Sequence, residues 1–261
     1  MCCFTGPVSH VSGTEIFARA DGSAQLLVYS MNVAADSEVA MVLPLPVPPG
    51  SPENAIRWID LSGYPELFEH LNAMFPTWTF GPGLSANPAA PAPLEVFTVG
   101  SFEASFVPSP ADFARLEPRF RLSDSALAAL PQYADWGFAV FKLRSIEADR
   151  PRTIHPMALR FPRRDPTALF FPTVHLHDGE VHARAHYDHH LYCQVRDPDA
   201  TERLTGWDGC HGSYQDAVDL ERAQGIIDPG LELVRLEVKG ELANEDWIVA
   251  LDEFEWRAGD S

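Results

Sequence analysis

The chain has 261 residues, a formal net charge of −18 and a sequence pI near 4.8, and such an acidic protein would repel the phosphates of nucleic acid. Hydrophobic residues make up 46% and charged residues 21% of the chain, which is typical of a globular protein and excludes a disordered one. No apolar run approaches the roughly 18–20 residues of a membrane-spanning helix, so we expect no membrane and no nucleic-acid partner.

The first part of the chain is predicted to be β structure. Residues 14–20 and 25–33 flank Asp21-Gly22-Ser23, a sequence typical of a hairpin turn. An apolar strand follows over 38–50, and its prolines at positions 44, 46, 48 and 49 predict that its end lies on a sheet edge or outside the sheet.

Two helical segments are predicted next. The first begins at Ser51 and runs through Trp58. The second, from Tyr64 to Phe75, is clearer because its apolar residues at 67, 68, 71 and 75 share one helix face. Residues 81–93 then hold four prolines and two glycines, and they mark a possible subdomain boundary within a single domain over 1–261.

The remaining elements alternate irregularly between strands and short helices. Strands are predicted at 94–107, 138–147, 155–162, 168–195, 231–240 and 246–256, and short helices near 109–116, 123–130 and 214–224. Strands outnumber helices and do not alternate with them regularly, so the sequence predicts an α+β fold with mainly antiparallel sheet.

Histidines cluster in the second β region, where residues 175–190 contain six of the ten. Asp178-Gly179 is typical of a two-residue type I′ turn, which would fix the register of a hairpin. In that register His175 lies opposite His182, and His177 lies on the same polar face. Directly opposed residues have Cβ atoms about 4.5–5.5 Å apart, so two imidazoles could share a metal ion.

The segment after this turn carries three further histidines and a cysteine. As a strand it would put His186 and His190 on the polar face and turn His189 and Cys193 inward. Imidazole, carboxylate and thiolate ligands together suit zinc, copper or iron. A solvated outer face accounts for one or two histidines, but six in sixteen residues favour a metal site. No fixed-spacing motif such as HExxH is present, so the prediction depends on composition and geometry.

The segment Trp207–Gly212 is a second site candidate. Cys210 and His211 are flanked by glycines, which would let the backbone approach a ligand closely. The alternative is a turn that contains a buried thiol, and we favour this alternative.

The amino terminus offers a third group of reactive side chains. Cys2 follows the initiator methionine, and a small residue at that position normally permits removal of Met1. The exposed α-amine and thiol of Cys2 could then chelate a metal together with Cys3. Alternatively, the thiol could be a nucleophile and the α-amine its base.

This second use has a parallel in a known family. The segments MCCF and TEIFARAD resemble the start of the N-terminal-nucleophile amidases that include penicillin V acylase and bile salt hydrolase. The resemblance implies that Cys2 is the nucleophile and that Arg19 and Asp21 lie beside it. It covers about twenty residues, and the chain departs from the family in its doubled cysteine and in lacking a suitably placed second asparagine.

A broader similarity covers about the first 80 residues and, more weakly, 155–193. The order of a terminal cysteine, an IFAR-D-G hairpin, a strand ending in VLPLPVP and a helix with FP-x-W is similar to a bacterial domain family of unknown function. That family is usually exported, and its mature chain also begins with cysteine. The resemblance implies an architecture and no chemistry, and it would make this chain a relative without a leader.

Three functions follow from these observations. The main prediction is a cytoplasmic metal-binding protein or metalloenzyme that takes a small molecule or metal ion, because the first residues lack a secretory signal and the four cysteines are too few for a disulfide scaffold. Its metal would be zinc, copper or iron, and its predicted ligands are His175, His177, His182, His186, His190, Cys2 and Cys3. The alternatives are an N-terminal-cysteine amidohydrolase with Cys2, Arg19 and Asp21, and a non-catalytic binding or assembly module.

Overall fold

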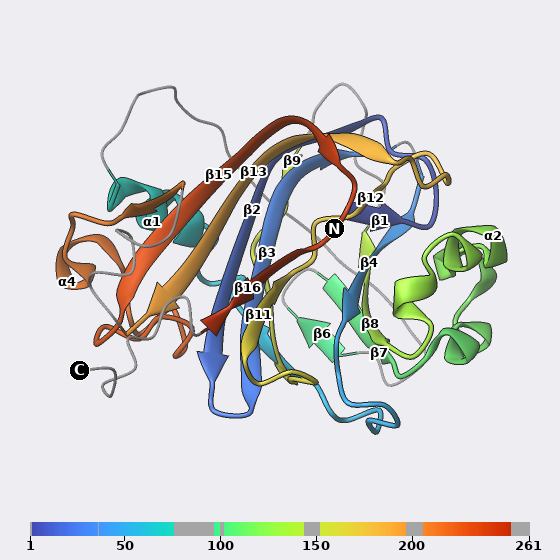
Figure 1. Ribbon diagram of the computed structural model, residues 1–261, viewed down its shortest axis with the longest axis horizontal. Coiled ribbons are helices and arrows are strands. Elements are labelled where there is room, and N and C mark those ends of the chain that lie inside the picture. The colour runs from blue at the N-terminus through green and yellow to red at the C-terminus, as the bar shows by residue number, and fades with distance from the viewer. Residues whose placement is uncertain are drawn as a thin grey trace, which may run out of the picture.

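The computed structural model describes residues 2–35, 37–75, 97–99, 102–143, 152–196 and 206–251. For Cys2 it describes the backbone position in a strand. These residues form two large β-sheets and one two-stranded sheet, with short helices outside them (Figure 1). The fold is α+β with mainly antiparallel sheet, as predicted from the sequence. The predicted boundary at 81–93 lies outside the described residues.

The first sheet has six strands. In spatial order they are β12 (His175–Leu176), β1 (Cys2–Phe4), β4 (Val39–Leu45), β8 (Gly137–Leu143), β7 (Phe102–Val107) and β6 (Phe97–Val99). All residues of β4 are buried, since the strand is covered on both faces. Within the described residues, β1 pairs with β4 at Met41 and Val42. On the other side of β4, Pro44 pairs with Phe138 and Leu45 with Gly137 of β8, so this end of the strand still lies within the sheet on that side.

The second sheet has eight strands. In spatial order they are β14 (Trp207–Gly209), β15 (Glu232–Ala243), β13 (Arg184–Val195), β2 (His10–Asp21), β3 (Ala24–Ala34), β10 (Met157–Pro162) and β5 (Arg57–Asp60), and β9 (Arg152–Thr153) also pairs with β3. The predicted β2–β3 hairpin is confirmed, with Gly22 at a φ of 60° in its turn. The small third sheet pairs β11 (Ala168–Phe171) with β16 (Trp247–Ala250).

The main hydrophobic core lies between the two large sheets. It draws side chains from β2, β3, β13 and β15 of the second sheet and from β4 and β8 of the first. Its members run from Phe4 near the amino terminus to Val249 near the carboxyl terminus. Burial of this apolar surface is the main stabilising contribution to the packing of the two sheets.

Helices cover the outer faces of both sheets. The second sheet carries α1 (Leu67–Ala73) and α4 (Tyr214–Ala217), and the first carries α2 (Asp124–Ala128) and the 3₁₀ turns η1 (Pro110–Arg115), η2 (Pro118–Phe120) and η3 (Pro131–Tyr133). The apolar face predicted for the helix near 64–75 is buried as expected. The predicted helix over 51–58 is wrong, because residues 57–60 pair with β10 as strand β5. The predicted helix near 214–224 shortens to α4.

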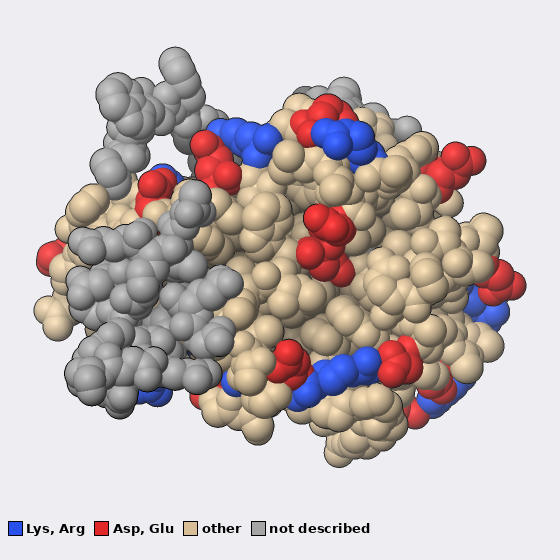
Figure 2. All heavy atoms as spheres, viewed as in Figure 1, with Lys and Arg blue, Asp and Glu red and all other residues tan. Residues whose placement is uncertain are grey.

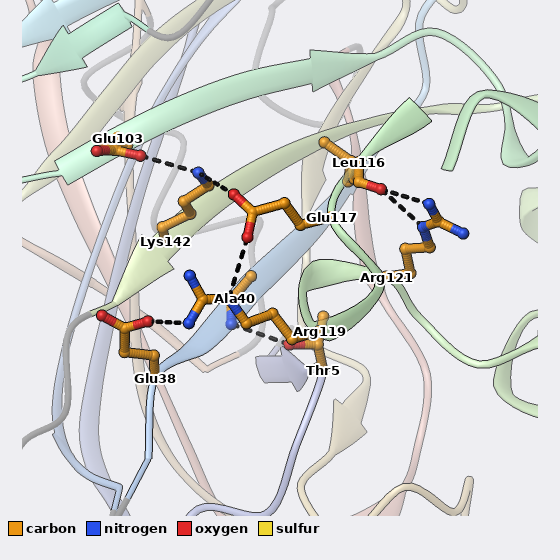
Figure 3. Close-up of polar contacts among 9 residues, drawn as sticks. All are labelled: Thr5, Glu38, Ala40, Glu103, Leu116, Glu117, Arg119, Arg121 and Lys142. Carbon is orange, nitrogen blue, oxygen red and sulfur yellow. Dashed lines mark hydrogen bonds and ion pairs between the residues drawn. The ribbon is translucent and has the colours of Figure 1, made fainter. Parts of the chain in front are cut away.

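An ion network connects η2 to the first sheet (Figure 3). The Lys142 ammonium of β8 lies 2.9 Å from a Glu103 carboxylate oxygen of β7 and 3.5 Å from one of Glu117. Arg119 of η2 then bonds to Glu117 and Glu38. On the face shown in Figure 2, acidic and basic side chains are interspersed, and neither sign gathers into an extended patch. No helix in the described ranges is long and apolar enough to cross a membrane.

Candidate functional site

Three imidazoles come together where β12, at the edge of the first sheet, meets β13 of the second. The Nε2 atoms of His175 and His189 are 3.1 Å apart, and the two rings stack with their centroids 5.0 Å apart. The ring of His177 stacks on that of His175, with a centroid separation of 4.8 Å. His189 is only 1% exposed and His175 only 9%. Two ring nitrogens this close share either a proton or a ligand.

Burial keeps the three imidazoles uncharged. It lowers the pKa of His175 to about 2, with the neighbouring His189 as a further cause, and it lowers the pKa of His177 to about 4. Burial also lowers the pKa of His189. Within the described part of the chain, the buried Nε2 of His177 has no hydrogen-bond partner. A neutral imidazole is the form that binds metal ions, so the cluster is in the ligand form at pH 7.

Aromatic rings surround the cluster. The Tyr187 ring lies 4.6 Å from that of His175 and 5.1 Å from that of His189, measured between centroids. The Phe4 ring of β1 meets His177 edge-on at 5.9 Å. These rings shield His175 and His189 from water, which strengthens any electrostatic interaction made there.

Strand β1, close to the amino terminus, lies beside β12 (Figure 1). Strand β1 runs parallel to β12, so that Cys2 pairs with His175 and Cys3 with Leu176. The sequence did not reveal whether Cys2 and the histidines are close in space. The strand pairing places Cys2 directly opposite His175. The Cys3 side chain is buried in a different cluster, with Tyr133 and Val174 on the outer face of the first sheet.

Two side chains from the loop before β16 fix the backbone that precedes His175. The Asn244 side chain accepts the His175 N–H at 2.7 Å and donates to the His175 carbonyl at 3.0 Å. The Asp246 carboxylate accepts the N–H groups of Thr173 at 2.8 Å and Val174 at 3.1 Å. Sequence reasoning missed both residues, because an Asn-Glu-Asp segment between two strands is typical of an ordinary turn.

The predicted histidine hairpin is wrong. Its pairing partners at 173–175 are replaced by Asn244, Asp246 and β1, so His182 does not lie opposite His175. The His182 side chain is 58% exposed and lies 2.8 Å from the carboxylate of Asp178.

The predicted alternation along β13 is confirmed. His189 and Cys193 point inward and are buried, whereas His186 is exposed. His190 lies on the outer face, with its ring nitrogens 3.6 Å from Glu15 and 3.4 Å from Glu237. Of the predicted ligands, the structure therefore brings together His175 and His177 and places Cys2 beside them. It adds His189, whose inward direction the alternation had already indicated.

The residues of the amidohydrolase alternative lie elsewhere. Arg19 donates hydrogen bonds to the carbonyls of Ile226 at 3.0 Å and Gly225 at 2.7 Å, and Asp21 pairs with Arg160 at 2.5 Å. Thr14, the β2 partner of His189, is five residues from Arg19, which is about 17 Å along a strand. The structure therefore does not bring Arg19 and Asp21 to Cys2.

The segment Trp207–Gly212 packs against the end of α1. The His211 N–H donates to the Met74 carbonyl at 3.0 Å, and a Cβ on Gly212 would lie 3.2 Å from the Met74 Cα. Burial raises the pKa of the Cys210 thiol, which makes it less reactive. The glycine at position 212 therefore permits close packing of the backbone against the end of α1, and not against a ligand as the sequence suggested.

In the described ranges, no group of three or more His, Cys, Asp or Glu side chains is arranged to hold a metal ion. The rings of His175 and His177 stack 23° from parallel, and so do those of His175 and His189, so the ring angle does not distinguish the two pairs. The contact that does is the 3.1 Å separation between the Nε2 atoms of His175 and His189.

No protein-family model matches the chain, and no curated protein matches it either. Among solved structures, the crystal structure of baculovirus P35 aligns with 95% of this chain and 99% of its own, at a TM-score of 0.48 and 11% sequence identity. At this level of similarity the alignment carries no conclusion about function.

Proposed function

We propose that the protein binds a transition-metal ion through His175, His189 and His177. The observation that carries the proposal is the 3.1 Å separation between the Nε2 atoms of His175 and His189. Two imidazole nitrogens that each lie about 2.0–2.1 Å from one zinc ion are roughly 3 Å apart. The spacing therefore suits one ion as well as it suits one shared proton.

The proton balance of the site is simple. In the metal-free protein, one of the two facing nitrogens donates its proton to the lone pair of the other. When an ion binds, that proton leaves Nε2, and the same ring takes up a proton at Nδ1. Both imidazoles then bind as neutral ligands. His177 would join by rotation of its side chain, whose buried Nε2 has no hydrogen-bond partner within the described residues.

Charge supports a further ligand. Three neutral imidazoles leave the charge of a divalent ion uncompensated in a buried site. Cys2 pairs with His175 in the sheet, and its thiolate would supply a negative charge. Imidazole and thiolate together suit zinc, copper or iron. A thiolate in the fourth position would close the site, as in structural metal sites, whereas an open position is typical of catalysis.

Elemental analysis with intact mass, on untagged protein expressed with zinc, copper and iron in the medium, tests the proposal. We expect about one equivalent of one of these metals, lost in His175→Ala/His189→Ala. The matched control is His182→Ala/His186→Ala, which removes two exposed histidines from the same segment and should retain the metal. His177→Ala is a milder site variant, since this side chain is only half-buried, and it should weaken binding without unfolding the protein.

The contrary results are distinct. Wild-type protein without metal, which also fails to bind added Zn²⁺ or Co²⁺, would overturn the proposal. In that case, loss of Met1 with rapid alkylation of Cys2 would favour the amidohydrolase, and retention of Met1 would favour the binding module. Metal that survives in the His175/His189 variant and disappears in the His182/His186 control would move the site to the exposed loop.

A further inference from the structure

We infer that the outer edge of β16 is a docking site for an extended peptide segment of a partner protein, with apolar residues at its centre and Lys or Arg at its ends. The segment would pair with Ile248 and Ala250 and add a third strand to the small sheet of β11 and β16. The inference does not depend on the proposed metal binding.

The pairing with β11 determines which backbone groups of β16 face outward. The Leu251 N–H donates to the Thr167 carbonyl at 2.7 Å, so these two residues form a hydrogen-bonded pair of the antiparallel ladder. Such pairs alternate along a strand, so the backbone groups of Val249 also point toward β11, whereas those of Ile248 and Ala250 point away from it. Within the described part of the chain, no backbone hydrogen bond reaches these two outward residues.

The opposite edge of the same small sheet is capped by side chains. Its outward residues are Phe170 and Ala168 of β11. The Gln25 side chain accepts the Phe170 N–H at 3.0 Å and donates to the Phe170 carbonyl at 2.7 Å. The Arg163 guanidinium donates to the Ala168 carbonyl at 3.2 Å. Side chains thus take the place of a neighbouring strand at the β11 edge, and no described residue does so at the β16 edge.

The side chains of β16 also favour pairing with an added strand. Charged residues discourage pairing at a strand edge, and the edge strands of the second sheet carry them at Arg57 and Asp60 of β5 and at Asp208 of β14. Strand β16 carries none. Its Ile248 is 62% exposed and is the one mostly exposed large apolar side chain in the described ranges. Backbone hydrogen bonds would hold the added strand, and one of its apolar side chains would cover Ile248.

Charge selects the occupant of this edge. The chain carries a net charge of −18, and Glu245 precedes β16 in the sequence while Asp252 and Glu253 follow it. A second copy of the chain would bring the same charges to the edge, and like charges on neighbouring strands are destabilising. A segment with Lys or Arg on both sides of a short apolar centre would compensate these charges.

The test measures amide hydrogen exchange by NMR on the full chain, with EDTA present. The probe is a capped synthetic peptide with alternating valine and threonine at its centre and two lysines at each end, and the matched probe has glutamates in place of the lysines. Ala250→Pro removes an outward N–H at a position where an edge strand tolerates proline, and Ala250→Val is the matched control that keeps this N–H.

In the free protein, exchange should be slower at Val249 than at Ile248 and Ala250. The lysine peptide should slow exchange at Ile248 and Ala250 by about tenfold or more, and the glutamate peptide should not. Ala250→Val should keep this protection. Ala250→Pro should lose it at Ile248 while Val249 exchanges as in the wild type, which shows that the ladder with β11 is intact.

Each contrary result has a distinct meaning. Absence of protection by the lysine peptide at about 1 mM, or protection of Ile248 in the free protein at low concentration, would overturn the inference. Protection that rises with protein concentration without peptide, together with a dimer mass in light scattering, would assign the edge to a second copy instead. Equal protection by the two peptides would overturn the choice of a basic partner. None of these results affects the metal site.

Discussion

The histidine cluster and the Lys142 network are two polar groups on opposite faces of the first sheet. Their polar side chains are stabilised away from water in different ways. In the network, each charge meets an opposite charge: Lys142 is 20% exposed and lies between Glu103 and Glu117 (Figure 3). In the cluster, burial lowers the pKa of His175 and of His189 and keeps both rings neutral, although the Asp188 carboxylate lies 3.7 Å from Nδ1 of His189.

This difference in charge compensation distinguishes a contact that only stabilises the fold from a group that could bind a ligand. Paired charges compensate each other, so they have little tendency to bind a further charged ligand. Neutral imidazoles in a dry environment keep lone pairs that only a proton or a metal ion can use. We therefore expect perturbation of the cluster to change both stability and ligand binding, and perturbation of the network to change stability alone.

The largest expected effect is on His189. In metal-free protein, His189→Ala should lower the free energy of unfolding by about 2–4 kcal/mol, because it leaves a cavity and removes the partner of His175 Nε2. Urea unfolding with EDTA present measures this change. His186→Ala, at an exposed position on the same strand, should stay within about 0.5 kcal/mol. Equal effects in the two variants would contradict the packing described for His189.

The next effect is the pH dependence of stability in metal-free protein. The folded-state pKa values of His175 and His177, about 2 and about 4, lie below the value of 6.5 for a free histidine. The unfolded chain therefore binds more protons, and stability present above pH 6.5 is lost as the pH falls toward 4. The slope is at most about 1.4 kcal/mol per pH unit for each histidine.

Urea unfolding at pH 7.5, 6.5, 5.5 and 4.5 checks the sign. His177→Gln should reduce the slope. His182→Gln is the control, and it should change the slope of stability against pH in the opposite direction. The reason is that the hydrogen bond to Asp178 raises the pKa of His182. A slope that is the same in the wild type and His177→Gln would show that His177 is not buried in its neutral form.

A smaller effect is expected for the half-buried ion pair of the network. A double-mutant cycle with Lys142→Met and Glu103→Gln should give a coupling energy of about 0.5–1 kcal/mol, since both side chains are mostly shielded from water. Metal content should be unchanged in both variants. Loss of metal in either would contradict the separation of the two groups.

The smallest effect is expected at the outer end of the same network. Arg119 and Glu38 are 57% and 44% exposed, and side-chain entropy and solvent screening offset most of their attraction. The cycle Arg119→Met with Glu38→Gln should give a coupling of about 0–0.5 kcal/mol, which 1 M salt reduces further. A coupling energy larger than that of Lys142 and Glu103 would contradict the expectation that the more buried ion pair is the stronger one.

Features that depend on neighbours in the chain were predictable from the sequence. The β2–β3 hairpin follows from its turn residues and alternation, and the buried face of α1 follows from its periodicity. The inward direction of His189 and the exposure of His186 follow from the two-residue period of β13. Each of these requires only the local geometry of a strand, turn or helix.

Features that depend on distant partners were decided by the tertiary structure. The turn at Asp178-Gly179 predicted a local hairpin, but the N–H of His175 bonds to Asn244, which is 69 residues away, and its strand partner is the amino terminus. The sequence by itself determined that many imidazoles lie in this segment and, along β13, that His189 faces inward, whereas His175 was predicted on the polar face and is buried. Only the tertiary structure decided that His175 meets His189 and not His182, because long-range hydrogen bonds replaced those of the local turn.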